Sequence, residues 1–439
     1  MSARAYPPGP SSLIPLLASF AIRRDPLTFL VDAARRYGDV VHLGIGRRHD
    51  YLVNRPDLIR DVLLAPEEQL LRSFPRTMKR VLGDGLLCSQ GAHHRAQRRL
   101  LQPFFHQDRV PGFAREIVLR SRRTCAGWRD GESLDIAEAM LALTLEIVVK
   151  VVFDRELDRG ATELLELLAP LVDTTRKRRW GLLERALTGL PFGPAHTQER
   201  AVQRLDAFIE SAIAERRESP ERHPDLLSML LDAGAEDRVV RDETLTMLAA
   251  GHETIGNCLA WTFHLLAQHP EAERRLQAEV DALGGPVEAG AVERLPFTGR
   301  VLLESMRLYP PVWLMVRRPV QDFQLGEYLV QAGAYIHLSQ YLTHRDPRWF
   351  PEPGRFDPER WLPEVEGTRP KICYFPFGGG GRKCIGESFA FLEGVLVLAT
   401  VSREFRLRPI PGPPVEAEPY VTLRPRHGLP MRLERRARA

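Results

Sequence analysis

The segment with the clearest chemical content is a glycine-rich run that leads to a cysteine. Residues 374–386 read YFPFGGGGRKCIG, so four consecutive glycines precede Arg382, Lys383 and Cys384. Glycine lets a backbone turn tightly and approach a flat ligand closely. A cysteine at the start of a helix, beside cationic side chains, is favoured as a thiolate, which is the form that binds metals. A thiolate on iron donates electron density and promotes O–O cleavage.

Two other interpretations of this run compete with metal binding. A phosphate-binding loop needs Lys followed by Ser or Thr, whereas Lys383 is followed by Cys384. A plain flexible turn would leave the surrounding Phe377, Arg382 and Gly386 without a role. Metal binding by the cysteine is therefore the favoured interpretation.

The run resembles the haem-binding signature of the cytochrome P-450 family. The pattern is F-x-x-G-x-R-x-C-x-G, and its fixed positions are Phe377, Gly380, Arg382, Cys384 and Gly386. The resemblance implies haem b (iron protoporphyrin IX) as the cofactor, with Cys384 as the axial ligand of the iron and the other four residues at the cofactor. It also implies a mainly α fold with minor β, in which a large helical lobe and a small β-rich lobe surround a buried haem.

A second motif lies on a helix predicted over residues 298–309, which Pro310 ends. Glu304 and Arg307 are three residues apart there, so they share a helix face and can pair. This pair resembles the family's E-x-x-R element, and the FDPERW run at 356–361 resembles the segment that adds a second arginine, Arg360. The resemblance implies a buried, bidentate charge network that serves folding and haem retention.

A third motif, AGHET at residues 250–254, lies within the longest predicted helix, residues 242–269, which begins at a capping acid. Glycine inside a helix costs about 1 kcal/mol relative to alanine, so Gly251 and Gly256 need a physical reason. A flat cofactor close to the helix, or a local opening of the helix, would supply one. The alternative is an ordinary helix with a packing face of small residues.

The chemistry of this third motif is proton delivery. An acid followed directly by a hydroxyl, as in Glu253 and Thr254, can pass a proton through water to a bound peroxide. The segment resembles the family's A-G-x-D/E-T element, with Ile255 where the family often has Thr or Ser. The resemblance implies that Glu253 is the proton source, Thr254 the partner of the oxygen, and Ala250 and Gly251 cofactor contacts.

Haem propionates require cationic or polar donors. His94 and Arg98 are four residues apart on a helix predicted over residues 91–101, so they share one face. They resemble the family's W-x-x-x-R element, with His94 where tryptophan is commoner. Arg382 and Arg317 match further propionate positions, although Arg318, next to Arg317, could take that role instead.

The overall composition is that of an ordinary globular protein of 439 residues with a net charge of +4. This charge does not suggest nucleic-acid binding. The five cysteines are scattered and include no CxxC pair, which argues against a disulfide framework and favours a reducing, cytoplasmic location. The apolar stretch at residues 13–22 is about half the ~20 residues needed to cross a bilayer, so we expect no membrane anchor.

Periodicity predicts how the elements are ordered along the chain. Helical spacing dominates residues 61–309 and includes 136–153 and 201–216, and a final helix runs from about Cys384 to residue 404. Strands are expected at 39–45 and 49–54, at 322–338 with turns at Gly326 and Gly333, and near 420–433. We expect one domain over residues 1–439, with a β-rich part mostly at 30–60 and 310–345 and a helical part mostly at 61–309 and 384–405.

The resemblance implies a monooxygenase that uses O₂ and externally supplied electrons to hydroxylate or epoxidise a hydrophobic small molecule, with a terpene or fatty acyl chain favoured. The electrons would come from a separate ferredoxin or flavodoxin with its reductase, and Lys383, Arg382 and Arg99 could form a positive docking surface. The alternatives are a peroxide-driven or non-oxidative haem-thiolate enzyme, a haem-based sensor without turnover, and a helical interaction protein without a cofactor.

Overall fold

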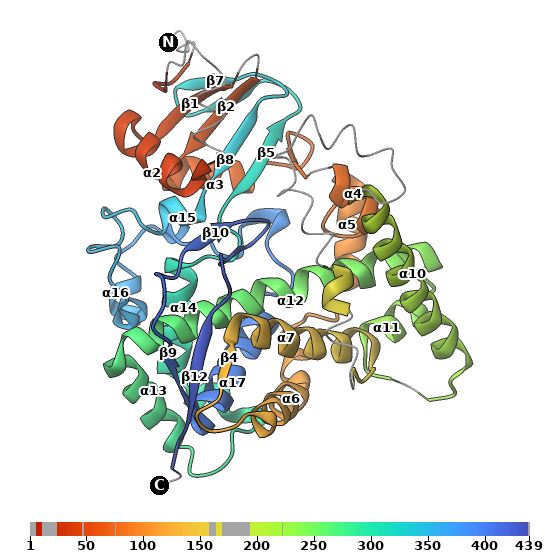
Figure 1. Ribbon diagram of the computed structural model, residues 1–439. Helices are drawn as coiled ribbons and strands as arrows, with labels where there is room; N and C mark the ends of the chain where they lie inside the picture. Colours follow the sequence, from red (N-terminus) through yellow and green to blue (C-terminus); the bar gives the residue numbers. More distant parts are fainter. Residues whose placement is uncertain are drawn as a thin grey trace. The chain divides into compact units, whose positions relative to one another are not determined.

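The computed structural model describes residues 6–10, 24–45, 48–74, 76–157, 164–168, 194–221 and 223–437. The chain divides into two compact units, each made of two stretches of sequence. One unit comprises residues 1–74 and 303–384, and the other comprises residues 75–302 and 385–439. Figure 1 shows the elements in chain order. The structure does not test whether the chain acts as a single domain.

The first unit is built on a five-stranded sheet in the order β1-β2-β8-β5-β3. Its strands are β1 (Val40–Ile45), β2 (Arg48–Val53), β8 (Tyr335–Leu338), β5 (Met315–Pro319) and β3 (Leu70–Arg72). Strands β2 and β8 are parallel and the other neighbours are antiparallel. Alternation along β5 buries Met315, Arg317 and Pro319 and exposes Arg318. The sheet therefore directs one of the two arginines inward.

Short helices and a hairpin complete the first unit. Its helices are α2 (Pro26–Tyr37), α3 (Pro56–Leu64), α15 (Gln340–Thr343) and α16 (Pro363–Glu366), and the hairpin joins β6 (Phe323–Leu325) to β7 (Tyr328–Val330). Asp25 caps α2, because its side chain accepts a hydrogen bond from Thr28 N at 3.1 Å. Gly326 and Gly333 have positive φ at the two predicted turns. The predicted strands and turns of residues 322–338 are confirmed.

The second unit is mainly helical. Its helices are α4 (Arg76–Leu82), α5 (Gly91–Leu101), α6 (Ala114–Gly127), α7 (Ile136–Phe153), α10 (Pro194–Glu218), α11 (Leu226–Asp232), α12 (Asp237–Gln268), α13 (Pro270–Asp281) and α17 (Glu387–Glu404). Helix α14 (Pro296–Leu308) contains the residue at which the two units divide. Helix α7 packs along α12 (Figure 1).

Two small sheets belong to the second unit as well. One is three-stranded, in the order β4-β12-β9, with β4 (Ser133–Asp135), β12 (Pro430–Arg435) and β9 (Phe405–Pro409). The other is the hairpin of β10 (Ala417–Pro419) and β11 (Leu423–Pro425), and its tip lies on α12. Among the described residues, none of the helices combines the length and the apolar character that crossing a bilayer requires.

Helix bounds agree with the sequence pattern in part. Helix α10, predicted over residues 201–216, spans Pro194–Glu218, and α14, predicted over 298–309, spans Pro296–Leu308. Helices α5 and α7 have the predicted bounds. Helix α12 begins at Asp237, whereas the prediction placed its start at Asp242. Asp242 does not cap the helix, because its carboxylate accepts a hydrogen bond from the backbone of Asp84 at 2.8 Å. The prediction took Asp242 for an N-cap because it is an acid that precedes an apolar run. In the fold, Asp242 lies inside the helix and holds the loop that contains Asp84.

Candidate functional site

The loop that carries Cys384 is folded by its own backbone. Gly378 and Gly380 have φ values of +73° and +64°, which side chains other than glycine rarely allow. A Cβ at Gly380 would lie 2.1 Å from the carbonyl oxygen of Leu63 in α3. The N–H of Cys384 donates to the carbonyl of Phe377 at 2.9 Å. Close packing on α3 therefore explains the glycine at Gly380, and its predicted role at the cofactor stays a prediction.

Helix α17 begins later than predicted. The prediction placed its start near Cys384, but the first helical residue is Glu387 and Gly386 is the N-cap. A short 3₁₀ turn, Gly380–Arg382, precedes the cysteine instead. The reason is local, because the bond from Cys384 to Phe377 closes the loop and fixes this backbone before the helix starts.

Cys384 differs from the other cysteines in its exposure. Cys88, Cys125, Cys258 and Cys373 are buried, whereas Cys384 is exposed. Burial raises the pKa of the Cys125 and Cys258 thiols to about 12. Burial also raises the pKa of Cys373 to about 11. These three thiols stay protonated near neutral pH, so Cys384 is the best placed of them to act as a thiolate ligand.

Two arginines lie together within the first unit. Arg317 is 4% exposed, and its guanidinium donates to the carbonyl of Val316 at 3.3 Å. Burial and then the charge of the neighbouring Arg382 lower the pKa of Arg317 to about 10. The Arg382 side chain is itself largely buried and pairs with Glu67 at 2.9 Å. Two guanidiniums with one neighbouring carboxylate form a site that would bind a further anionic group.

The same contacts change the predicted docking surface. We predicted that Arg382, Lys383 and Arg99 would present positive charge to a partner. The Arg382 side chain is 6% exposed and ion-paired with Glu67, so it does not contribute to the outer surface. Lys383 and Arg99 are exposed.

The predicted charge network around Glu304 is present within the first unit. Glu304 and Arg307 are both fully buried, and two hydrogen bonds of 2.8 Å join their forked side chains. Arg360 approaches Glu304 at 3.4 Å. Trp361 and the backbone of Asp357 also donate to the Glu304 carboxylate, at 3.0 and 2.9 Å. The carboxylate is thus surrounded by donors, which is the condition for burying an ion pair at low cost.

The remaining donors of Arg307 bind backbone carbonyls, and His344 extends the network. Arg307 donates to the carbonyls of His344, Pro353 and Arg355 at 2.8 to 3.0 Å. The His344 ring in turn accepts a hydrogen bond from the N–H of Phe375 at 3.0 Å. Burial and then the charge of Arg307 hold the pKa of His344 well below its usual value, so the ring is a neutral acceptor. A continuous set of contacts therefore joins the E-x-x-R pair to the segment that precedes the cysteine loop.

The two glycines of α12 are explained by helix packing. A Cβ at Gly251 would lie 2.9 Å from the side chain of Val148, and one at Gly256 would lie 3.0 Å from Leu141 and Thr144. These contacts are all with α7. Helix α12 is continuous through this stretch, so the local opening that we considered is absent. The packing alternative accounts for both glycines, while contacts of Ala250 and Gly251 with a cofactor stay predictions.

Glu253 and Thr254 lie in the middle of α12 in different surroundings. Glu253 is 8% exposed, and its carboxyl accepts a hydrogen bond from the Thr422 hydroxyl at 2.7 Å. Burial raises the pKa of Glu253, and the Thr422 bond and the Arg424 charge oppose that rise. The Thr254 hydroxyl donates to the carbonyl of Ala250 at 2.9 Å, which leaves its oxygen able to accept. A buried acid that favours its protonated form is suited to proton delivery.

Helix α5 places His94 and Arg98 on one face, as their spacing predicted. His94 is buried and Arg98 is half-buried. Their predicted role toward propionates stays a prediction.

For several residues around the predicted site, the sequence did not indicate which partner they bind, although Trp361 lies in the FDPERW run. Trp361 binds Glu304, His344 binds Phe375, and Thr422 binds Glu253. Each acts on a partner more than thirty positions away in the sequence, so spacing could not have indicated it. A motif indicates which residues share an element but not which distant loop closes on that element.

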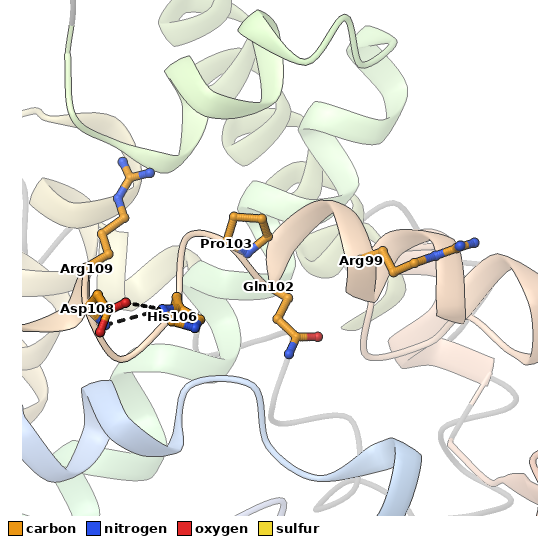
Figure 2. A pocket seen from close by; sticks show the side chains of 6 residues that line it. All are labelled: Arg99, Gln102, Pro103, His106, Asp108 and Arg109. Carbon is orange, nitrogen blue, oxygen red and sulfur yellow. Dashed lines mark hydrogen bonds and ion pairs between the residues drawn. The ribbon is translucent and has the colours of Figure 1, made fainter.

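The structure also shows an open cleft of about 790 Å³ on the second unit, which begins at Arg99, the residue after Arg98 on α5. Its lining consists of Arg99, Gln102, Pro103, His106, Asp108 and Arg109. Figure 2 shows the Arg99 and Arg109 side chains at opposite ends, with His106 paired to Asp108 at 3.2 Å between them. The cleft is a shallow surface with cationic ends.

Comparison with known proteins agrees with the motifs. The cytochrome P-450 family model matches residues 7–429. A cyclooctat-9-en-7-ol 5-monooxygenase of Streptomyces melanosporofaciens is 36% identical over 413 residues, which cover 91% of this chain and 89% of the relative. Pentalenene oxygenase of Streptomyces avermitilis is 30% identical, with 93% of this chain and 90% of the relative covered.

Solved structures give the same fold. The crystal structure of a cytochrome P-450 (CYP102L1) is similar with a TM-score of 0.85 at 25% identity, covering 99% of this chain and 100% of that one. The cytochrome P450DA haem domain reaches 0.88 at 24% identity, covering 99% and 98%. The mainly α fold with a minor β part is thereby confirmed. The chain therefore belongs to the cytochrome P-450 family and is one of its monooxygenases.

Proposed function

We propose that this monooxygenase hydroxylates or epoxidises a terpene, with haem b held by the thiolate of Cys384. The observation that supports the substrate class is the pair of relatives whose names refer to cyclooctat-9-en-7-ol and pentalenene, each aligned over more than nine-tenths of this chain. We place the substrate against residues 74–87, 164–192, 249–250, 312–315 and 421–422, whose short segments are largely apolar apart from Arg76, Lys79 and Arg80. Most of the region 164–192 lies outside the described residues.

The residues fit the cofactor that the family implies. Cys384 is the exposed thiol of the chain, and Arg317 is a buried guanidinium next to a second one, so an anionic propionate would relieve their repulsion. His94 and Arg98 on α5 are the further proposed propionate partners. When bound, haem would supply O₂ activation for insertion into a C–H or C=C bond, and the thiolate of Cys384 that would hold it favours O–O cleavage.

The chain's own contribution to this chemistry is proton supply and exclusion of charge. We assign Glu253 as the proton source, because it is a buried carboxyl beside Thr254 and burial raises its pKa, which favours the form that can donate a proton. We assign the Thr254 oxygen as a hydrogen-bond acceptor, because its own proton is engaged by Ala250. His252 stays neutral, since burial lowers its pKa to about 4 and its ring bonds to the carbonyl of Leu248.

Electrons are proposed to come from a separate acidic ferredoxin or flavodoxin with its reductase. Lys383 on the first unit, and Arg99 and Arg109 at the cleft of the second unit, carry the positive charge for such a partner. Charge reversal at Lys383 and at Arg99 should slow the reduction and weaken its dependence on salt, since surface charge acts mainly on the rate of encounter. A reduction rate and salt dependence that stayed unchanged would contradict a docking role for Lys383 and Arg99.

The proposal is tested by the absorption spectrum of the reduced protein exposed to carbon monoxide. The wild type should show a strongly red-shifted Soret band, and Cys384→Ala should lose that band. Cys373→Ala is the matched control, because its thiol is buried in the same unit and should leave the band intact. A Soret band typical of histidine ligation in the folded wild type would overturn the assignment of Cys384.

The substrate class needs its own test. Terpenes, including cyclooctat-9-en-7-ol and pentalenene, should shift the haem spectrum at lower concentration than fatty acids do, and NADPH with a surrogate redox chain should convert them. Tighter binding and faster conversion of a fatty acid would replace the terpene proposal with the acyl alternative. A spectral shift without conversion would instead support a haem-based sensor.

A further inference from the structure

Three residues of α12 bind the tip of the β10–β11 hairpin. Glu253, Asn257 and Trp261 are spaced four apart, so they form one stripe along the helix. Asn257 Nδ2 donates to Thr422 Oγ1 at 3.0 Å, and Trp261 Nε1 donates to the carbonyl of Leu423 at 3.0 Å. All of these side chains are buried. The hairpin is therefore held in a fixed register along the helix.

This register decides where the single proton of the Thr422 hydroxyl points. The hydroxyl oxygen accepts from Asn257, and the hydroxyl proton is donated to Glu253 Oε1 at 2.7 Å. The adjacent Thr254 cannot replace this donor in the observed arrangement, because its own proton goes to the carbonyl of Ala250. Oε1 is thus occupied from the hairpin side, and Oε2 is the oxygen left to carry the acid proton.

We propose that Thr422 is a positioning residue for proton delivery: oriented by Asn257, its hydroxyl fixes the Glu253 carboxyl so that the acid proton leaves from and returns to Oε2. When that proton leaves, the Thr422 donor stays on the carboxylate, and a proton from water restores the acid. The inference rests on the proposed role of Glu253, which it deepens by assigning a donor that lies 169 positions away in the sequence.

The charges around the carboxyl are few, so a change in this donor should be measurable. Titratable groups on the elements packed against α12 include Glu146 of α7, Glu393 of α17 and Arg424 of β11. Among the described residues, Arg424 is the charged group that acts on the pKa of Glu253, and Arg424 itself pairs with Glu418 at 3.0 Å. Removal of the Thr422 donor should raise the pKa of Glu253, because the bond stabilises the carboxylate.

The decisive experiment follows the Glu253 carboxyl itself. Infrared spectra of the purified holoenzyme are recorded across pH, and the Glu253→Gln spectra are subtracted to isolate the band of this carboxylic acid. Thr422→Val, which keeps the shape and removes the donor, should move the midpoint upward by about one pH unit, a tenfold change in dissociation constant. Thr422→Ser keeps the donor and should restore the midpoint. Asn257→Leu should produce a smaller shift in the same direction.

The matched control is Thr262→Val on the same helix. Thr262 is fully buried, but its hydroxyl donates to the carbonyl of Cys258 and does not contact Glu253, so the midpoint should not move. An unchanged midpoint in Thr422→Val, or a shift of equal size in Thr422→Ser, would show that Thr422 only packs the hairpin and would overturn the proposal. If Thr422→Val does not fold, Asn257→Leu decides between the same two outcomes.

Turnover supplies a second readout. The alkaline limb of the pH profile should move upward in Thr422→Val, and more of the consumed NADPH should appear as peroxide. Absence of the haem-thiolate spectrum would contradict the proposed function, whereas the carboxyl titration does not depend on iron ligation. The two failures are therefore distinguishable.

Discussion

Two buried glutamates show how the same side chain serves two purposes. Glu304, in the first unit, receives two bonds from Arg307, one from Trp361 and one from the backbone of Asp357. Glu253, on α12 in the second unit, receives one bond from a neutral hydroxyl, and burial raises its pKa. The Glu304 carboxylate is surrounded by donors, and these bonds fix the fold around it. A carboxyl with one donor keeps a proton that it can transfer.

Glu243 repeats the second case without a proposed role in catalysis. It is fully buried on α12 and accepts one bond, from the N–H of Leu86 at 3.0 Å. Burial raises the pKa of Glu243 to about 7, and the neighbouring Asp242 adds to the rise. Glu243 and Glu253 therefore share burial, a single donor and a raised pKa, whereas Glu304 shares only the burial and is held by several donors.

The largest expected effect is at Arg307. Arg307→Leu would leave the Glu304 carboxylate buried with the strongest of its partners removed, and this should lower the free energy of unfolding by about 3–5 kcal/mol. Urea unfolding followed by circular dichroism measures the change. Arg355→Leu removes an exposed pair with Glu352 and should cost less than about 1 kcal/mol. Equal losses in the two variants would break the comparison.

Glu243→Gln should raise the free energy of unfolding, in contrast to Arg307→Leu. Below about pH 4.5 the carboxyl is neutral in both the folded and the unfolded chain, so the variant and the wild type should be equally stable. As pH rises from about 4.5 to about 7, the wild type loses stability, because the carboxyl ionises in the unfolded chain while it stays protonated in the fold. Above about pH 7 the loss is complete. The variant should therefore be more stable by about 1–3 kcal/mol at pH 8. A stability difference that did not depend on pH would show that Glu243 is ionised in the fold.

His344→Leu tests whether the Glu304 network supports the cysteine loop. The variant leaves the N–H of Phe375 buried without its acceptor, so the free energy of unfolding should fall by about 1–3 kcal/mol. Haem should also dissociate faster, as measured by transfer to apomyoglobin. His344→Gln offers an amide oxygen as a replacement acceptor and should recover part of both losses. Haem release at the wild-type rate in His344→Leu would mean that the network ends before the loop.

The smallest expected change in the free energy of unfolding is at Glu253, where the variant should affect the reaction and not the fold. Glu253→Gln should lower product formation by about 10²-fold or more, since general acid catalysis is lost, while the stability at pH 7 should change little. Product per NADPH and thermal unfolding are measured on the same preparation. Full activity in this variant would show that the proton source lies elsewhere. Glu253 would then not differ from Glu304 in function.

The sequence alone determined the family, the order of the elements and the pairs of residues that share an element. The bounds of α5 and α7, the Glu304–Arg307 pair and the position of Cys384 before a helix follow from spacing, because periodicity and capping are local properties. The starts of α12 and α17 were predicted wrongly. At α12, the Asp242 carboxylate binds the backbone of Asp84, far away in the sequence. At α17, the N–H of Cys384 binds the carbonyl of Phe377 in the preceding loop. The local pattern indicates neither contact.

Only the tertiary structure decided what surrounds each acid. The donors to Glu304 come from residues 357 and 361, and the donor to Glu253 comes from residue 422, so neither number of donors can be read from a motif. The same holds for Gly251, whose reason is the side chain of Val148 on a neighbouring helix. A sequence specifies which groups are present on an element, whereas a pKa and a packing contact depend on distances that arise only when distant segments meet.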